Sequence, residues 1–483
     1  MSKFTKATSF LLTFVIIITS AVSITANAQS FTKEGWNTYW ENSTQEIEAA
    51  IMMTPGNNET ERYVSWYSDT DSGYVLLSDA SGQKINDFTA AAKATPQGDY
   101  RLSAVIAGLE AGKTYTYYCK SGEFTSDIYT FTTASDDSFT ALFITDIHIS
   151  GDTLDNEGLV ENSYNLNTTI NTAVEKSQSQ GKTVDLLLSA GDQGSDGLRT
   201  EYSGLCATPY LKSIPTATTV GNHDRKSVDY RYFTHQPNTA DMLLKSYVGT
   251  DYWFVKGNVL FLIIDSNNIS MGDHRRFVKQ AVEANEDVKW RVAMFHHDLY
   301  SGRKPNRESE NKWLRLMWAP IADEFGFDLC LLGHSHYYTI SNVLYNNENV
   351  SSTADGCTVT DAQGTIYMVS GSINRPRDDE DIGLSDKIGH AYLTMEKIYN
   401  LIDFSEHSIV INSYTVESNE KIGNITIEKT NNEGGHVYKT PSKLYYPVVE
   451  VISFIAGFFN NIGRYYDNTQ LGFNIPLFEG LFG

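Results

Sequence analysis

Six short segments of the chain carry histidine, aspartate, asparagine or serine, each just after an apolar run, and four of the six contain a glycine. In chain order they are Asp146-Ile147-His148, Gly191-Asp192-Gln193, Gly221-Asn222-His223-Asp224, His296-His297, Gly333-His334-Ser335-His336 and Gly371-Ser372. Imidazole and carboxylate groups together suit zinc, iron and manganese ions. Because the carboxyl ends of parallel strands meet at one edge of a sheet, these distant segments can converge on one cleft. The pattern predicts a metal centre there.

The number of candidate ligands suits two metal ions. Two ions about 3.5–4 Å apart need a shared anionic ligand, and Asp192 is the carboxylate expected to bridge them. The other expected ligands fall into two sets around this residue: Asp146, His148 and His336 for the first ion, and Asn222, His296 and His334 for the second.

One ligand position has two candidates in the sequence. Trp290–Phe295 has the pattern of a buried strand, and either His296 or His297 could be the first residue beyond it that faces the metals. His296 is the preferred ligand, which would make His297 a supporting or loop residue.

The first 28 residues have the pattern of a secretory signal peptide. Lys3 and Lys6 precede an apolar run from Phe10 to Ile18, and Ala26-Asn27-Ala28 offers a small-residue cleavage site. An uncleaved membrane anchor is the alternative, but the run is short for a bilayer span. We therefore expect a secreted or cell-surface protein.

Charge and cysteine content narrow the functional classes. A net charge of −22 argues against nucleic-acid binding, because an acidic surface repels a phosphate backbone, although a metal site can still take a small phosphorylated substrate. The four cysteines fit no zinc-binding spacing. Their even number permits disulfides in an exported chain, but Cys330 lies in an expected central strand, where a buried thiol is favoured. Pairing and oligomeric state stay open.

The region from residue 29 to 137 is expected to be a small all-β domain. Its expected strands, Val64–Tyr67, Gly73–Leu77, Tyr100–Ile106, Thr114–Tyr118 and Tyr129–Thr132, are separated by Gly, Asp, Ser and Asn clusters. Short strands at this spacing suggest a sandwich. Leu109–Tyr117 resembles the fibronectin type III signature, so a positioning module is expected.

The pattern changes after a polar linker at residues 134–138. From residue 138 to 430, apolar runs alternate with longer helical segments, expected around Val160–Gln180 and Glu310–Phe325. The expected strands are Phe139–Thr145, Val184–Ala190, Thr216–Val220, Val259–Ile264, Val292–Phe295, Phe327–Leu332 and Ile366–Val369. Such alternation predicts an α/β domain whose sheet faces are covered.

The tail from residue 431 to 483 has apolar residues at helical spacing between Val448 and Phe459. This stretch is too short to span a bilayer, but it could dock on the rest of the chain, self-associate or lie on a membrane or cell surface. Docking is favoured, so deletion of residues 445–483 is expected to lower solubility or stability.

Taken together, the motifs resemble the calcineurin-like metallophosphoesterase family, whose pattern is D-x-H, G-D, G-N-H-D/E, H and G-H-x-H. The resemblance covers roughly residues 139–415 and implies a β-sandwich flanked by helices in four layers (αββα). The all-β region ahead of it resembles the layout of purple acid phosphatases. Thr54-Pro55-Gly56 ahead of Val64-Ser65-Trp66, and the strand at Tyr129–Thr133, carry that second resemblance.

Three positions depart from the purple acid phosphatase pattern. His148 stands where that pattern, D-x-G, has glycine, and Ser195 stands where G-D-x-x-Y has a tyrosinate ligand. Tyr338 is followed by Thr339-Ile340 rather than by Glu-Arg. Since imidazole suits divalent ions, the resemblance implies two divalent ions or a mixed iron and divalent pair, drawn from Zn, Mn and Fe, and a protein without an intense visible band.

The expected reaction is hydrolysis of a phosphoester. A water activated at the ions would attack phosphorus in line with the leaving oxygen, Asn222 and His223 would contact the substrate, and His223 would act as general acid with Asp224 orienting its ring. A phosphomonoesterase of the acid-phosphatase kind is expected. The alternatives are a phosphodiesterase or nucleotidase, and a non-enzymatic surface protein with a degenerate hydrolase domain.

Substrate specificity is expected to lie in the loops at residues 226–238 and 302–311. Several basic residues could meet a phosphate, but a solvated surface charge is the favoured interpretation for each: Arg303, Lys304, Arg307, Arg375 and Arg377.

Overall fold

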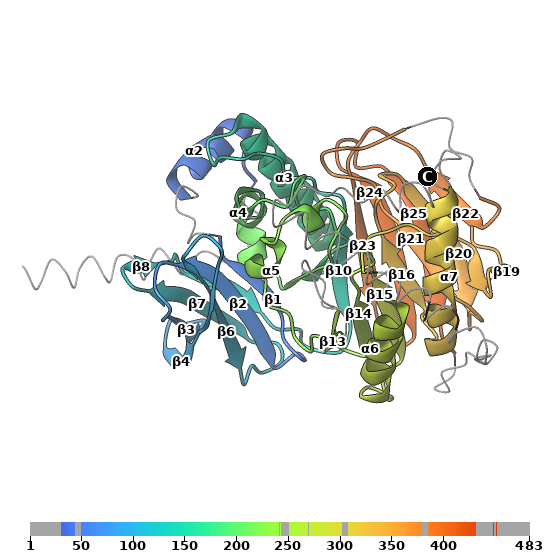
Figure 1. Ribbon diagram of the computed structural model, residues 1–483, viewed down its shortest axis with the longest axis horizontal. Coiled ribbons are helices and arrows are strands. Elements are labelled where there is room, and N and C mark those ends of the chain that lie inside the picture. Colours follow the sequence, from blue (N-terminus) through green and yellow to red (C-terminus); the bar gives the residue numbers. More distant parts are fainter. Residues whose placement is uncertain are drawn as a thin grey trace, which may run out of the picture.

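The structure, a computed structural model, describes residues 30–43, 50–240, 242, 251–268, 270–301, 308–378, 385–430, 448 and 451. A small all-β unit lies beside a larger α/β unit (Figure 1). The expected signal peptide at residues 1–28 lies outside the described residues. So does the tail from residue 431, apart from Val448 and Val451.

The all-β unit is a sandwich of two antiparallel sheets, as expected. One sheet has the order β1 (Met52–Pro55), β2 (Glu61–Ser68), β6 (Tyr100–Ala107) and β5 (Ala91–Ala94). The other has the order β4 (Lys84–Thr89), β3 (Tyr74–Asp79), β7 (Thr114–Ser121) and β8 (Phe124–Thr125), with β9 (Tyr129–Thr132) also paired to β7. Alternate residues of β7 point inward, so Tyr115, Tyr117 and Cys119 pack with Trp66 in the core between the sheets.

The α/β unit contains two seven-stranded sheets. The first has the order β12 (Thr216–Thr218), β11 (Val184–Ser189), β10 (Phe139–Ile144), β23 (Ile398–Phe404), β24 (Ser408–Thr415), β25 (Lys421–Glu428) and β20 (Cys357–Thr360). The second has the order β13 (Tyr252–Lys256), β14 (Val259–Ile263), β15 (Trp290–Met294), β16 (Leu329–Leu332), β21 (Ile366–Val369), β17 (Tyr338–Ser341) and β22 (Ile388–Tyr392). The strands β18 (Val343–Tyr345) and β19 (Glu348–Ser351) form a separate two-stranded sheet, which is bridged through Leu344 to Thr365 beside β21.

Side-chain alternation along the strands explains how the two sheets pack. In β10, Phe143 lies in the core between the sheets, whereas its neighbour Leu142 faces the helices of the first sheet. In β14, Phe261 and Leu262 divide in the same way between the central core and the helices of the second sheet. Each sheet therefore buries one face against the other sheet and one face under helices.

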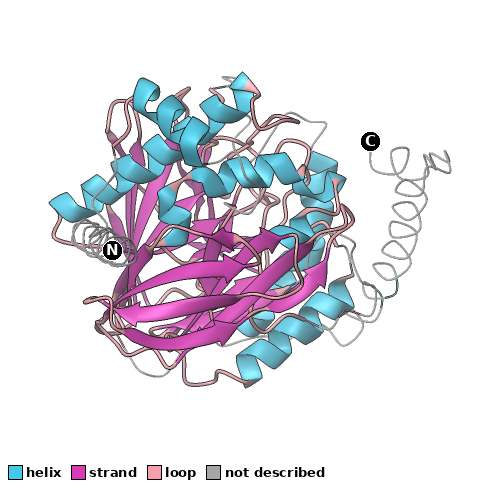
Figure 2. Ribbon diagram, turned by 90° about the vertical axis from the view of Figure 1, so that its left-hand side faces the viewer, coloured by secondary structure: helices cyan, strands magenta, loops and turns pink. Residues whose placement is uncertain are grey.

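Helices cover both outer faces and complete four layers (Figure 2). On the first sheet lie α2 (Lys33–Ser43), α3 (Glu157–Ser179), α4 (Arg199–Ala207) and α5 (Tyr230–Phe233), with the short turns η2 (Pro209–Lys212) and η3 (Asp224–Lys226). On the second lie α6 (Met271–Glu283) and α7 (Glu308–Phe325). The expected αββα arrangement is confirmed.

The all-β unit is joined to the loop that follows the G-N-H-D segment. Arg101 of β6 is buried, donates to the carbonyl oxygen of Ala50 at 3.0 Å and contacts that of Phe233 in α5. Thr54 of β1 donates to the carbonyl oxygen of His235 at 2.6 Å. The sandwich therefore fixes part of the 226–238 loop, one of the two segments expected to govern specificity; residues 302–307 of the other lie outside the described residues.

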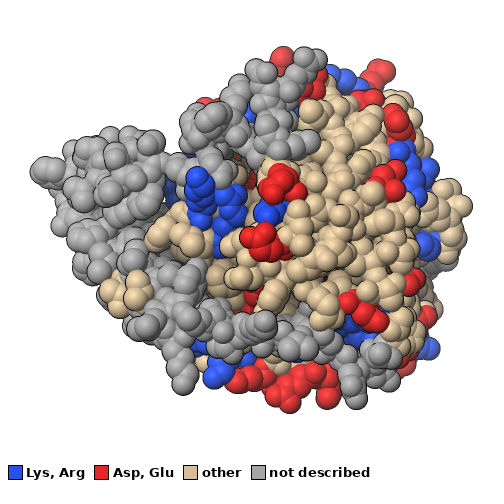
Figure 3. Space-filling model, turned by 90° about the vertical axis from the view of Figure 1, so that its right-hand side faces the viewer, with Lys and Arg blue, Asp and Glu red and all other residues tan. Residues whose placement is uncertain are grey.

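Surface and cysteine features complete the description. No described helix has the length and apolar character that a bilayer crossing requires. All four cysteines are free thiols, three of them buried, including Cys330 as expected. On the face shown in Figure 3, basic and acidic side chains lie beside one another among neutral residues, so its described part carries mixed charge.

Candidate metal centre

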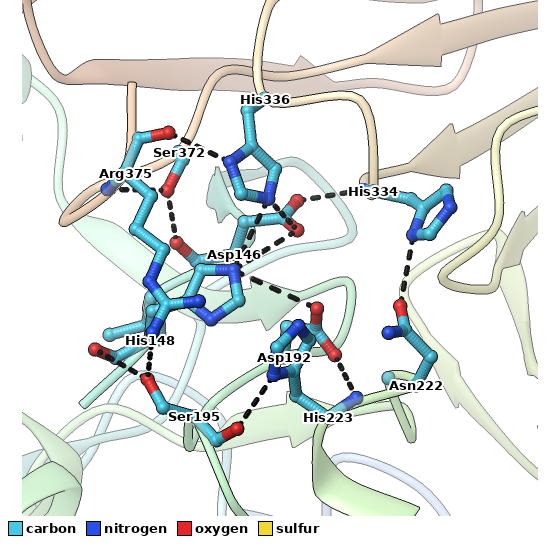
Figure 4. Close-up of polar contacts among 12 residues, drawn as sticks. Asp146, His148, Asp192, Ser195, Asn222, His223, His334, His336, Ser372 and Arg375 are labelled. Carbon is cyan, nitrogen blue, oxygen red and sulfur yellow. Dashed lines mark hydrogen bonds and ion pairs between the residues drawn. The ribbon is translucent and has the colours of Figure 1, made fainter. Parts of the chain in front are cut away.

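All seven expected ligands lie together beyond the carboxyl ends of the strands. Those on the first sheet follow β10, β11 and β12, and those on the second follow β15 and β16: Asp146, Asp192 and Asn222, then His296, His334 and His336. His148 follows Asp146 by two residues. Figure 4 labels six of the seven side chains, His148 among them, and shows them converging from several loops; His296 is not labelled.

The backbone at the centre adopts an uncommon conformation. Five of the expected ligands have positive φ angles between 49° and 72°: Asp146, His148, Asp192, His334 and His336. Left-handed backbone is costly for residues with a Cβ and persists where surrounding contacts hold it. Here Asp146 N donates to Gly191 O at 3.0 Å and His148 N to Asp192 O at 2.9 Å, which joins the two loops.

Two glycines allow the loops to approach the ligands closely. Gly191 has φ +95°, and a Cβ there would lie 2.6 Å from Nδ1 of His296. A Cβ on Gly221 would collide with the Asp192 carboxylate. Each of these glycines therefore leaves room that a larger residue would take from a neighbouring ligand side chain.

The first set of expected ligands is tightly gathered. Nε2 of His336 lies 3.1 Å from Oδ1 of Asp146 and 3.2 Å from Nε2 of His148. Nε2 of His148 lies 3.7 Å from Oδ2 of Asp192. Donor atoms about 2.0–2.2 Å from one ion stand about 2.8–3.6 Å from each other in octahedral or tetrahedral geometry. The two spacings of His336 match a single ion site, and that between His148 and Asp192 is slightly longer.

The second set is arranged in the same way. Oδ1 of Asn222 lies 3.0 Å from Nε2 of His296 and 2.9 Å from Nδ1 of His334, and these two nitrogens are 3.3 Å apart. His297 instead places Nδ1 2.8 Å from Oγ of Ser266. Of the two adjacent histidines, His296 is the one that the structure brings into the set.

Asp192 belongs to both sets. Its Oδ2 lies 3.3 Å from Nε2 of His296 and 3.7 Å from Nε2 of His148, while its Oδ1 accepts the backbone N–H of His223 at 2.8 Å. A single carboxylate oxygen thus faces ligands of both expected ions. This is the position that a bridging carboxylate requires.

Hydrogen bonds orient the imidazoles so that their free nitrogens point inward. His296 donates from Nδ1 to the carbonyl oxygen of Ala190 at 2.8 Å, and His336 from Nδ1 to that of Arg375 at 2.7 Å. Such donation fixes the tautomer and leaves Nε2 to bind a metal. Burial lowers the pKa of His148 to about 3, which keeps its imidazole neutral, as a ligand must be.

The electrostatics of the centre call for a bound cation. Oδ1 of Asp146 is buried and forms no hydrogen bond with any described residue. Burial tends to raise the pKa values of Asp146 and Asp192, because it disfavours the charged carboxylate. The neighbouring imidazoles outweigh this effect and hold both pKa values well below their usual range. Burial tends to lower the pKa of His296, because it disfavours the charged imidazolium, but Asp192 raises that pKa to about 9. Two buried carboxylates that stay charged among imidazoles fit a pair of metal ions, and ions binding here would displace the His296 proton.

His223 lies at the edge of this cluster and is partly exposed. Its Nδ1 donates to the carbonyl oxygen of Ser195 at 2.6 Å, and its ring packs edge-on against His148 with centroids 4.8 Å apart. Nζ of Lys226 lies 3.0 Å from the same Nδ1 and donates to Ser195 O at 2.8 Å. The ring is held from its Nδ1 side, which leaves Nε2 for other partners.

Asp224 has a different role from the one expected. Its carboxylate is fully buried and accepts the backbone N–H groups of Gly221 at 2.9 Å and Gly194 at 3.1 Å, and the Tyr202 hydroxyl at 3.1 Å. Burial and the neighbouring Asp192 raise its pKa to about 7. Asp224 therefore ties the two ligand loops together, and Ser195, not Asp224, orients the His223 ring.

Three supporting residues have functions that the sequence did not indicate. Ser372 donates from Oγ to the carbonyl oxygen of Asp146 at 2.6 Å. Buried Asp298 accepts the Ser335 hydroxyl at 2.6 Å and the backbone N–H of Ser301 at 3.0 Å. In the sequence, Ser195 stood out only because it replaces the tyrosine of the purple acid phosphatase pattern G-D-x-x-Y. A carboxylate directly after the His296-His297 pair was the one available signal for Asp298.

Two regions of the chain match models of known families. Residues 139–338 match calcineurin-like phosphoesterase, and residues 49–133 match the N-terminal domain of purple acid phosphatase. No curated protein sequence matches the chain significantly. These matches and the candidate ligands identify the larger unit as that of a metal-dependent phosphoesterase.

Solved structures share the fold at low sequence identity. A purple acid phosphatase, PPD1 from yellow lupin (Lupinus luteus) seeds, is 14% identical with a TM-score of 0.64, over 82% of this chain and 77% of its own. A structure of PhoD is 11% identical with a TM-score of 0.52, over 86% of this chain and 99% of its own. The chain thus shares its overall fold with a purple acid phosphatase and with PhoD.

Proposed function

We propose that the protein is a secreted phosphomonoesterase of the acid-phosphatase kind. It would use two divalent ions, or iron with a divalent ion, held by the seven expected ligands. The observation that carries this proposal is the shared position of Asp192, whose Oδ2 faces His148 on one side and His296 on the other. The architecture common to this chain and a purple acid phosphatase supports the monoester as substrate.

Bound ions would supply an activated water and offset the negative charge of the phosphoryl group. The remaining work falls to side chains. Asp146 and Asp192 would hold the ions, and the Asn222 amide, which is partly exposed beside His296, would meet a phosphoryl oxygen. Attack on phosphorus would be in line with the leaving oxygen.

His223 would donate a proton to the leaving oxygen. Because its Nδ1–H is engaged by Ser195 O, the proton that moves is the one on Nε2. Ser195 and Lys226 hold the ring in that orientation from the opposite side.

Secretion is proposed from the signal-peptide pattern of residues 1–28, and attachment to a cell or membrane surface through residues 431–483 is a further part of the proposal. Hydrolysis of phosphodiesters or nucleotides is the alternative, since it could use the same ligands. A non-enzymatic surface protein is disfavoured because two full ligand sets are gathered at one place.

The proposal is tested by metal analysis together with hydrolysis of para-nitrophenyl phosphate. Asp192→Asn is expected to lose both metal and turnover, because one side chain serves both ions. His223→Ala is expected to keep its metal and lose about 10²- to 10⁴-fold in kcat, the usual size of general acid catalysis. An Asp192→Asn protein with two metals and full rate would rule out the bridging role.

A further inference from the structure

Arg375 lies on the exposed side of the metal centre, in the segment that follows β21. Its backbone is fixed by the centre itself: its N–H donates to Oγ of Ser372 at 3.0 Å, and its carbonyl oxygen accepts Nδ1–H of His336 at 2.7 Å. Ser372 in turn donates to the carbonyl oxygen of Asp146. Arg375 is therefore placed by two of the expected ligands.

The side chain of Arg375 extends past His148 toward Ser195 (Figure 4). Its Nη2 donates to Oγ of Ser195 at 3.0 Å. Ser195 holds the place where purple acid phosphatases have a tyrosinate ligand, and here its short side chain anchors an arginine.

No described carboxylate lies within ion-pair distance of Arg375. Asp196 is close enough for Arg375 to help lower its pKa, which is set mainly by Lys226, but its Oδ1 is paired with Nζ of Lys226 at 2.8 Å. Other arginines of this acidic chain do pair with carboxylates, as Arg199 does with Asp99 and Arg275 with Glu324. Arg375 is exposed and spends one of its five N–H donors on a neutral hydroxyl.

An exposed arginine beside a metal centre is suited to bind an oxyanion. Guanidinium donors match the oxygen spacing of phosphate and can engage two oxygens at once. A phosphomonoester carries up to two negative charges, and a diester carries one. A further cation next to the ions therefore benefits the monoester more.

We propose that Arg375 is a substrate-binding residue that donates to a non-bridging oxygen of the phosphoryl group and makes the site selective for dianionic phosphomonoesters. This rests on the proposed function. Ser195 acts as a positioning residue, since its hydroxyl holds one arm of the guanidinium and leaves the others to the substrate.

The test compares kcat/KM of the metal-loaded protein for para-nitrophenyl phosphate and bis(para-nitrophenyl) phosphate. Arg375→Gln is expected to lower the monoester value about 10- to 100-fold, the effect of one charged hydrogen bond, and the diester value by about threefold at most. Binding of inorganic phosphate, measured by calorimetry, should weaken about as much as the monoester value falls, with metal content unchanged. Arg375→Lys should recover part of the loss, because lysine keeps the charge but not the paired donors.

Arg377→Gln is the matched control. Arg377 is exposed two residues further along, and its backbone pairs with Thr394, so its replacement should change neither ester. Equal losses for both esters in Arg375→Gln, or none, with metal intact would overturn the role of Arg375 and leave the proposed function standing. If the wild-type protein hydrolysed neither ester, the proposed function would fail and this inference with it.

Discussion

At the scale of single residues, the centre depends on side chains that never meet an ion. Asp298 is the clearest case: it is buried, and it accepts from Ser335, which stands between His334 and His336, as well as from the segment that follows His296. One carboxylate thus ties together the loops that carry three expected ligands. Residues in such positions usually affect metal affinity nearly as strongly as the ligands do.

Asp298→Asn is expected to weaken metal binding about 10- to 100-fold, since the amide nitrogen in place of Oδ2 cannot accept the hydroxyl hydrogen bonds of Ser335 and Ser301. Competition with a metal-binding dye would measure the affinity. Asp287→Asn serves as the control, because Asp287 is exposed between α6 and β15. Unchanged affinity in the Asp298 variant would show that the loops hold their shape without this carboxylate.

The gathering of the candidate ligands could be predicted because their segments follow strands whose carboxyl ends meet at one edge of the sheets. The direction of a side chain could not. Asp224 follows His223 directly, yet its carboxylate turns inward to backbone N–H groups of two loops, and the partner of the His223 ring is a carbonyl oxygen. Backbone groups leave no trace in residue type, so neither contact was available from the sequence.

At the scale of elements, the all-β unit acts as a brace for the phosphoesterase unit. The turn between β5 and β6 carries Asp99, which forms a two-pronged ion pair with Arg199, the first residue of α4. Nη1 of Arg199 lies 2.9 Å from Oδ1 of Asp99, and both side chains are mostly buried. A cation at a helix N-terminus is unfavourable unless a carboxylate offsets it.

A double-mutant cycle with Asp99→Asn and Arg199→Gln should give a coupling of about 1–2 kcal/mol in the free energy of unfolding, more than an exposed pair. Burial tends to raise the pKa of Asp99, but Arg199 outweighs this effect and holds that pKa below its ordinary value of 3.8. The contribution of the pair is therefore present above that ordinary value and is lost as pH falls through the lowered one. Coupling that survives full protonation of Asp99 would contradict the ionic origin.

Sequence patterns located most of the central strands, including the alternating strands β6 and β7, and missed several others. Strands such as β10 and β16 were expected because they are buried throughout, and β11 because it is buried over its last four residues. By contrast, β4 and β5 are almost fully exposed, and β24 and β25 alternate between buried and partly exposed residues. The antiparallel strands β24 and β25 were therefore not foreseen, and neither was β23, although it is almost fully buried; together they turn the first sheet into a mixed one.

At the scale of the whole molecule, the metal centre joins two sheets. Asp146, Asp192 and Asn222 come from the first sheet, and the histidines of β15 and β16 come from the second. An ion with ligands from both sheets links them at the edge where their strands end. Anything that binds the folded state alone stabilises it by mass action.

Removal of the metals with a chelator is expected to lower the Tm of the protein, by an amount that grows with metal affinity, and re-addition should restore it. Differential scanning calorimetry would measure the shift. Asp192→Asn should be nearly insensitive to the chelator. An equal Tm with and without metals in the wild type would show that the two sheets hold together independently of the ions.

At the five ligand positions with left-handed backbone, stability and activity favour different residues. Glycine at His148 or Asp192 would relieve backbone strain of about 1–3 kcal/mol at each position, together with the desolvation of buried polar groups, but it would delete a ligand. A library screened for heat resistance without metals should therefore accumulate glycine at these positions and become inactive. Only a screen that also demands turnover would keep the histidines and aspartates. These residues are therefore retained for activity at a cost in stability.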